Sequence, residues 1–203
     1  MSVTCVSYAA EGWGVGEVWH EGARLVWHEL PRPRTADASL SAHGAFLGRR
    51  ARARGGARVT PTQGGVVDPP PSRSRVPAKP APVRGRSTPE VERLVHRFGA
   101  YFEGNTVEFA DVAIDDEGWT AFQCDVVSAM RRVPYGEVVS YSDLARLAGH
   151  PRAQRAAGTV CARNRFPLVV PCHRIVSAEG LGSYPGLGLE YKRRMLALEG
   201  VTL

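Results

Sequence analysis

Residues 140–163, SYSDLARLAGHPRAQRAAGTVCAR, decide the fold of the C-terminal half of this chain. Ser140 and Asp143 fit the capping pattern that starts a helix, and Gly149 follows the apolar stripe in the position that ends one. Pro151 suits the first turn of a second helix, which we expect to run to the end of the stretch. Two short helices joined by a tight turn predict a helix-turn-helix.

The second of these helices carries few large side chains. Alanine or glycine occupies positions 153 and 156–158, and Arg155 stands among them. A bare helix can approach a narrow minor groove closely, and an arginine on it could enter the base stack of a duplex from which a nucleotide has rotated. The same alanines would also suit simple packing against the neighbouring helix, so both interpretations stay open at this point.

Downstream, Pro171-Cys172-His173-Arg174 follows the apolar run 166–170. The run predicts a short buried strand that ends at the proline and presents Cys172 at its end. A thiol with a pKa of about 8.5 is mostly protonated at neutral pH, so a nucleophilic cysteine needs a neighbouring base, and His173 is the obvious candidate. The alternative is that Cys172 is a small core residue.

Upstream of the helix-turn-helix, the pattern predicts a mixture of strands and helices. Three runs rich in β-branched and aromatic residues predict a meander of strands over 3–9, 16–20 and 23–29. Thr88-Pro89 predicts the start of a helix that reaches about Phe102, and 107–114 predicts a further strand. Apolar residues at helical spacing from Trp119 to Met130 predict another helix, in which Cys124 is packed rather than reactive.

The chain therefore looks like an α+β protein with two domains. We expect an N-terminal α/β domain over residues 1–115 and a mostly helical C-terminal domain over 116–203. Residues 32–87 interrupt the first domain with twelve Lys and Arg against two acidic residues, within a chain of net charge +6. This basic segment, rich in proline, glycine and arginine, predicts a disordered insertion that either binds phosphates non-specifically or serves as a solvated linker.

Composition excludes several classes of protein. No window approaches the roughly 18 uninterrupted apolar residues of a membrane span, and the N-terminus lacks a signal-peptide pattern. The four cysteines of the chain form no C-x-x-C pair and no dense framework, so neither a zinc ribbon nor a disulfide scaffold is indicated. We expect a cytoplasmic protein with reduced thiols.

Taken together, these residues resemble the O6-alkylguanine-DNA alkyltransferase family, also called methylated-DNA-protein-cysteine methyltransferases. The resemblance runs from Trp119 to Gly200 and rests on these stretches: Val138-Val139-Ser140-Tyr141, Leu147-Ala148-Gly149, Arg155-Ala156-Ala157-Gly158, Asn164, Pro171-Cys172-His173-Arg174 and Leu198-Glu199-Gly200. It implies a ribonuclease-H-like N-terminal domain and a winged-helix-like helix-turn-helix domain. The basic insertion has no counterpart in the family pattern.

The resemblance implies a role for each catalytic residue. Cys172 would accept the alkyl group, His173 would deprotonate it through a water, and Glu199 would orient that histidine. Asn164 would brace the active-site turn, and Tyr141 would donate a hydrogen bond to the guanine as it leaves.

The resemblance also implies a set of DNA-binding residues. Arg155 matches the arginine that enters the duplex, and the loop at Ser183 and Tyr184 would cover the rotated base. The full expected set is Arg152, Ala153, Gln154, Arg155, Ala156, Gly158, Ser183 and Tyr184.

The implied function is DNA repair by stoichiometric transfer of the alkyl group from O6-alkylguanine to Cys172. We expect a single-turnover suicide methyltransferase that acts as a monomer on double-stranded DNA from the minor groove, with the alkylated guanine flipped out. No cofactor and no membrane are implied, and Cys5, His20 and His28 do not complete a zinc ligand set. In a prokaryote the protein would associate with the nucleoid, and the sequence leaves open whether O4-methylthymine is also a substrate.

Two alternatives belong to other classes. A non-catalytic relative would bind the alkylguanine lesion without transferring the group, but such relatives lack the cysteine that Cys172 provides. A helix-turn-helix transcription regulator with a structural cysteine would need a surface for reading the major groove, and the alanine-rich second helix offers little of one.

Overall fold

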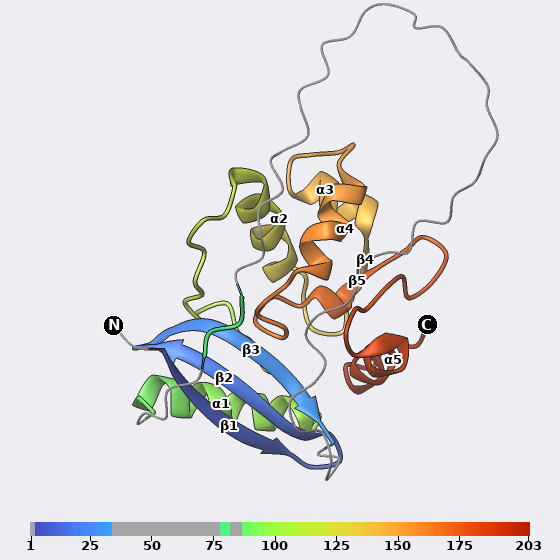
Figure 1. Ribbon diagram of the computed structural model, residues 1–203. Helices are drawn as coiled ribbons and strands as arrows, with labels where there is room; N and C mark the ends of the chain where they lie inside the picture. Colours follow the sequence, from blue (N-terminus) through green and yellow to red (C-terminus); the bar gives the residue numbers. More distant parts are fainter. Residues whose placement is uncertain (1–2, 34–77, 82–86) are drawn as a thin grey trace, which may run out of the picture. The chain divides into compact units, whose positions relative to one another are not determined.

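The computed structural model describes residues 3–33, 78–81 and 87–203. Their contacts group these residues in one compact unit, in which a small sheet and several helices share one hydrophobic core (Figure 1). The mixed α/β class predicted from the sequence is confirmed. The basic insertion and its predicted disorder lie almost wholly outside the described residues, and the domain boundary near residue 115 stays a prediction.

The N-terminal residues form the predicted meander. Strands β1 (Thr4–Ala10), β2 (Gly14–Glu21) and β3 (Arg24–Arg32) pair antiparallel in that order, and β2 and β3 are longer than the sequence predicts. Gly22 takes a φ of +60° in the turn between β2 and β3, a conformation that glycine adopts without strain.

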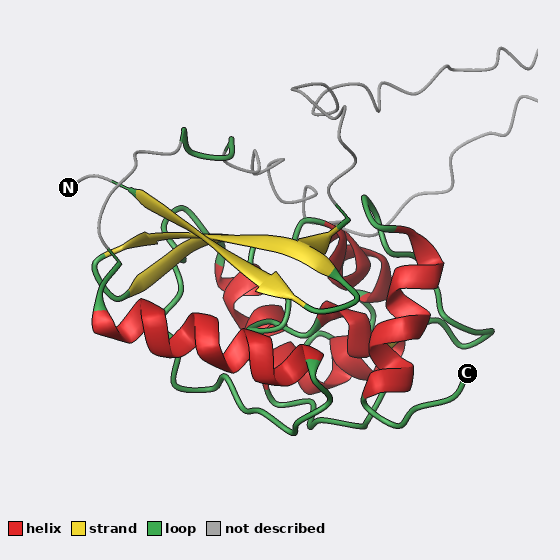
Figure 2. Cartoon of the chain, turned by 90° about the horizontal axis from the view of Figure 1, so that it is seen from below, coloured by secondary structure: helices red, strands yellow, loops and turns green. Residues whose placement is uncertain are grey.

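Helix α1 (Pro89–Phe102) lies along one face of this sheet (Figure 2). It starts where the sequence predicts, because the Thr88 hydroxyl accepts the Val91 N–H and Pro89 occupies the first turn. Its buried residues include Phe98, whose ring stacks on His28 of β3 at 4.2 Å between centroids. The sheet and α1 therefore form one packed layer pair.

The strand predicted over 107–114 is wrong. Within that segment the structure shows one isolated bridge, between Ile114 and Leu25. The reason is Arg131, whose guanidinium donates to the carbonyls of Phe109, Ala110 and Val112. Those carbonyls therefore bond a side chain in place of a neighbouring strand.

The C-terminal residues form short helices around a minimal parallel sheet. The elements are α2 (Ala121–Arg131), β4 (Val139–Ser140), α3 (Tyr141–Leu147), α4 (Gln154–Ala162), β5 (Ile175–Val176) and α5 (Gly188–Leu198). Ser140 caps α3 as predicted, since its hydroxyl accepts the Asp143 N–H at 3.1 Å. Thr120 caps α2, so Trp119 precedes that helix instead of belonging to it.

Helix α4 begins three residues later than the sequence predicts. Gly149 takes a φ of +82° and ends the first helix, and the Ala153 N–H then bonds the His150 carbonyl in a turn. This turn uses Pro151 and Arg152 as part of the connection between the two helices. Arg152 and Ala153 consequently lie outside α4, while α3 and α4 still pack on each other and on α2.

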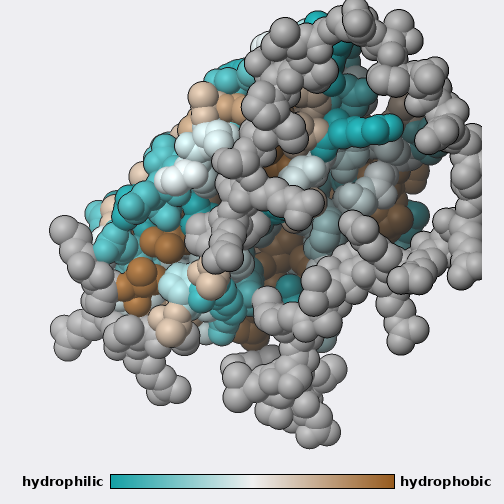
Figure 3. All heavy atoms as spheres, turned by 45° about the horizontal axis from the view of Figure 1, so that its top comes forward, coloured by the Kyte–Doolittle hydropathy of each residue, from teal (hydrophilic) through white to brown (hydrophobic). Residues whose placement is uncertain are grey.

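None of the helices in the described ranges is long and apolar enough to cross a membrane. On the face that Figure 3 displays, hydrophobic side chains stand in separate groups between hydrophilic ones.

His28 of β3 connects the sheet to the loop that precedes Cys172. The His28 N–H bonds the Arg165 carbonyl at 2.9 Å, and its side-chain Nδ1 donates to the Pro167 carbonyl at 2.7 Å. Nε2 must then accept the Tyr8 hydroxyl, 2.8 Å away, which requires a neutral imidazole. Burial lowers the pKa of His28 to about 4, so the ring is neutral at pH 7.

We expect acid to destabilise the protein through His28. Because the pKa is about 6.5 in the unfolded chain and about 4 in the folded one, the unfolded chain binds the extra proton between these values. The free energy of unfolding should fall by on the order of 3 kcal/mol as the pH drops through that window. Denaturant titrations at pH 4, 5, 6 and 7 would measure this.

The control is His28→Gln, which cannot titrate. Its unfolding free energy should depend less steeply on pH than that of the wild type over the same range. Equal slopes for the two proteins would contradict the assignment.

Candidate active site

The apolar run before the cysteine is a buried turn, and the predicted strand is wrong. The Val170 N–H bonds the Phe166 carbonyl, and Leu168 takes a φ of +70°. Asn164 spans this turn, because its Oδ1 accepts the Phe166 N–H at 2.9 Å and its Nδ2 donates to the Val170 carbonyl at 2.7 Å. A side chain therefore takes the backbone groups that a strand ladder would have used.

Cys172 begins a single 3-10 turn that runs to Arg174. Its side chain is 9% exposed, and its Sγ lies 3.1 Å from Asn164 Nδ2. Burial raises the pKa of the Cys172 thiol, while the Asn164 hydrogen bond and the Lys192 charge oppose that effect. The group is a thiol at neutral pH, so it needs a base to become nucleophilic.

His173 is fully buried and neutral. Burial lowers its pKa, although the hydrogen bond that it donates to Glu199 works in the other direction. Nε2 lies 2.8 Å from Glu199 Oε1 and must donate to it, which leaves the lone pair on Nδ1. Nδ1 is buried and has no hydrogen-bond partner among the described residues. A basic nitrogen is thus present one residue after the thiol.

Glu199, just after helix α5, is an ionised carboxylate held by several donors. Arg174 donates to both of its oxygens, at 2.9 and 3.0 Å, and the Gly136 N–H donates to Oε2 at 3.2 Å. Burial raises the pKa of Glu199, but the hydrogen bonds from His173 and Arg174 outweigh it and lower the pKa to about 2. His173 and Glu199 are therefore joined by a hydrogen bond, and Cys172 directly precedes His173 in the sequence.

Sequence reasoning missed two buried polar residues beside this group. Lys192 on α5 is fully buried, and its Nζ donates to the carbonyls of Ile175 and Leu181 at 2.5 and 2.6 Å. Tyr101 on α1 is also fully buried and bonds Glu199 at 2.7 Å. Both occupy the apolar face of their helix, so a polar residue at helical spacing within that face was the available signal.

Only some of the expected DNA-binding residues lie together around one hollow of the surface. An open hollow of about 420 Å³ is lined by Tyr141, Gln154, Arg155, Gly158 and Ser183, together with Thr159, Ala162 and Arg163. Tyr184 does not line this hollow, and its hydroxyl lies 3.7 Å from Met195 Sδ and close enough to Cys172 to lower the thiol's pKa. Arg152, Ala153 and Ala156 do not line the hollow.

The small residues of α4 are only partly used for packing in the core. Ala157 is fully buried in the core, whereas Ala156 and Gly158 are half-buried. A Cβ added at Gly158 would lie 3.6 Å from the Tyr141 ring, and one at Gly182 would lie 3.1 Å from the same ring. Tyr141 is therefore enclosed between α4 and the 182–184 loop, where small neighbours leave room for its ring.

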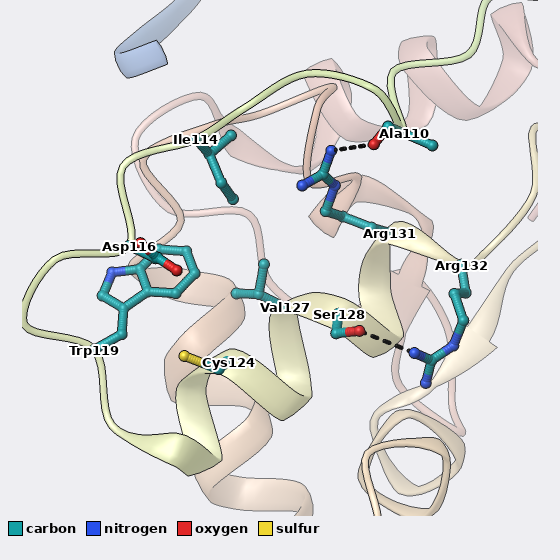
Figure 4. Close-up of a pocket in the computed structure, with 9 residues that line it drawn as sticks. All are labelled: Ala110, Ile114, Asp116, Trp119, Cys124, Val127, Ser128, Arg131 and Arg132. Carbon is teal, nitrogen blue, oxygen red and sulfur yellow. Dashed lines mark hydrogen bonds between the residues drawn. The ribbon is translucent and has the colours of Figure 1, made fainter. Parts of the chain in front are cut away.

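A second hollow, of about 390 Å³, lies beside α2 (Figure 4). Cys124 lines it and is exposed, so the prediction that this thiol is packed is wrong. Burial still raises the pKa of Cys124. Arg131 and Arg132 border the hollow but donate to backbone carbonyls and to Ser128. None of the residues of the Cys172 site lines it.

No group of three or more His, Cys, Asp or Glu side chains that could hold a metal ion is found within residues 3–33, 78–81 and 87–203. His20 and His28 instead bond the carbonyls of Gly22 and Pro167.

Removing the Asn164 amide should make Cys172 less reactive. In Asn164→Ala the thiolate loses a hydrogen bond that lowers its pKa, so less thiolate forms at neutral pH. We expect alkylation of Cys172 by iodoacetamide at pH 7.5 to slow by about tenfold, which is the size of one hydrogen bond to a charged group. Peptide mass spectrometry measures the rate for each cysteine, and Cys124 is the internal control, because its rate should not change.

A family model described as the 6-O-methylguanine DNA methyltransferase DNA-binding domain matches residues 121–201. The methylated-DNA-protein-cysteine methyltransferase of Methanopyrus kandleri is 42% identical over 123 residues, which make up 57% of this chain and 90% of that protein. The enzyme of Mycolicibacterium paratuberculosis is 43% identical over 105 residues, which make up 52% of this chain and 62% of that protein.

Solved structures agree with these sequence matches. The crystal structure of Mycobacterium tuberculosis O6-methylguanine methyltransferase has a TM-score of 0.62 and 27% identity, over 98% of this chain and 93% of that one. The same protein has also been solved in complex with DNA, with a TM-score of 0.62 and 28% identity. The chain belongs to the methylated-DNA-protein-cysteine methyltransferase family.

Proposed function

We propose that this chain repairs DNA by moving the alkyl group of O6-alkylguanine onto Cys172, once per molecule. The observation that carries the proposal is a neutral, buried imidazole whose Nε2–H is fixed on an ionised carboxylate and which directly follows a buried thiol in the sequence. This arrangement supplies a nucleophile, a base and an orienting group. The family membership established above is consistent with it.

The reaction is a single displacement. The thiol proton passes to His173 Nδ1, directly or through one water, while Sγ forms a bond to the alkyl carbon and the bond from that carbon to O6 breaks. The electron pair leaves with guanine, and the Tyr141 hydroxyl donates to the departing base. The product is a thioether, which offers no easy route back to the thiol, so each molecule reacts once.

The duplex would bind across the hollow between α4 and the 182–184 loop. Arg155, which is exposed on α4, would enter the base stack from the minor groove and fill the space that the flipped guanine leaves. Gln154 and Gly158 would lie against the backbone, and Ser183 and Tyr184 would cover the base. Arg152, Ala153 and Ala156 would contact the DNA outside the hollow.

We assign the sheet and α1 to a ribonuclease-H-like domain and α3 and α4 to a winged-helix-like one. The protein would act as a monomer without a cofactor, in the cytoplasm and, in a prokaryote, on the nucleoid. O4-methylthymine would be tested as a second substrate alongside O6-methylguanine.

Intact-protein mass spectrometry tests the reaction. After incubation with a duplex that contains one O6-methylguanine, the wild type should gain one methyl group, mapped to Cys172 and limited to one per molecule. Cys172→Ala should gain none, whereas Cys124→Ser should behave as wild type. Lesion-selective binding without any mass gain would favour the non-catalytic lesion binder, and absence of selective binding would favour the transcription regulator.

Replacing Arg155 tests base flipping. Arg155→Ala should slow methyl transfer from a duplex by about tenfold or more, since unstacking a base costs a few kcal/mol. Transfer from a single-stranded oligonucleotide, in which little unstacking is needed, should slow much less. Arg193→Ala removes the same charge from α5 and should leave both rates near the wild-type values. Equal slowing on both substrates would show that Arg155 acts only through electrostatic attraction.

A further inference from the structure

Helix α1 reaches the Cys172 site through one side chain, Tyr101. The Tyr101 hydroxyl lies 2.7 Å from Glu199 Oε1 and 3.3 Å from His173 Nε2, and the residue is fully buried. The contact spans 98 residues of sequence, from the helix that covers the N-terminal sheet to the last turn before the C-terminus. Helix α1, which lies outside the region 121–201 that the family model matches, thus contacts His173 and Glu199.

The direction of these hydrogen bonds follows from the charges. Ionised Glu199 can only accept. Burial and then the Glu199 charge raise the pKa of Tyr101 well above its usual 10, so the phenol keeps its proton and donates. His173 Nε2 and Arg174 donate to the same oxygen, at 2.8 and 3.0 Å. Oε1 therefore receives three donors, and Tyr101 makes the shortest of these contacts.

The ring of Tyr101 is itself fixed by packing. It meets His173 edge to face at 6.3 Å between centroids, and Phe102 and Tyr135 in the same manner at 5.2 and 6.2 Å. Since α1 packs on the sheet, the hydroxyl has a defined position relative to Glu199. This rigidity is what a residue that orients another group requires.

We propose that Tyr101 is a positioning residue for alkyl transfer, which holds Glu199 Oε1 against His173 Nε2 and so helps to set the basicity of His173. The proposal deepens the function proposed above and rests on it. A donor on Oε1 draws electron density from the oxygen that faces the imidazole. Without it, Glu199 would stabilise a protonated His173 more strongly, and the carboxylate would be less firmly placed.

Tyr101→Phe tests this proposal, because it removes only the hydroxyl and keeps the packed ring. Single-turnover methyl transfer from an O6-methylguanine duplex would be followed between pH 5 and pH 9. At pH 7 we expect the rate constant to fall on the order of tenfold, which is the size of one hydrogen bond to a charged group. The acidic limb of the pH profile should move to higher pH, because His173 would be protonated more readily.

Tyr8→Phe is the matched control. It also removes a buried hydroxyl that bonds a histidine nitrogen, but that histidine is His28, which does not touch Glu199. Its acidic limb should coincide with that of the wild type, even if its stability falls. A Tyr101→Phe profile that coincides with those of the wild type and of Tyr8→Phe would overturn the proposal.

A separate readout distinguishes failure of the proposed function from failure of this inference. If the wild type transfers no methyl group, the function proposed above is wrong. The pH dependence of Cys172 alkylation by iodoacetamide, followed by peptide mass spectrometry, then tests Tyr101 without DNA. A shifted midpoint in Tyr101→Phe alone supports the inference, and identical midpoints in all three proteins reject it.

Discussion

The buried negative charge of Glu199 is the constraint on which the rest of the site depends. An isolated carboxylate inside a protein is so unfavourable that it would take up a proton, and a neutral acid could not fix the imidazole in one tautomer. Arg174, Gly136 and Tyr101 prevent this by supplying donors from three separate parts of the chain. The folding of those parts around one charge is therefore also the step that assembles the reactive group.

A second constraint acts on the loop that carries Cys172. Leu168 has a backbone conformation that a leucine disfavours, and its side chain is 2% exposed. The loop keeps this conformation because Asn164 bonds it from within and His28 bonds it from the sheet. Burial of apolar side chains and satisfied carbonyls thus outweigh a local strain of roughly 1–3 kcal/mol.

The sequence was sufficient to predict features that depend on local chemistry. The cap at Thr88, the cap at Ser140 and the alternation in the meander led to helices and strands that the structure contains. The two strands that were wrongly predicted share a cause, since in each a side chain from outside the segment bonds its backbone groups. Arg131 did so for 107–114 and Asn164 for 166–170, and neither contact leaves a periodic pattern. The position of Tyr101 on the apolar face of its helix was visible in the sequence, but its partner was not, because Glu199 is 98 residues away.

The residues that support the Cys172 loop from the sheet come before the connection between β3 and α1 in the sequence, and the residues of the Cys172 site come after it. His28 and Tyr8 precede it, whereas Tyr101, Cys172 and Glu199 follow it. A chain cut within this connection would leave the sheet on one fragment and Tyr101, Cys172, His173 and Glu199 on the other. Reassembly of the two fragments could then be detected as recovered reactivity at Cys172, so this fold is suited to a split-protein reporter.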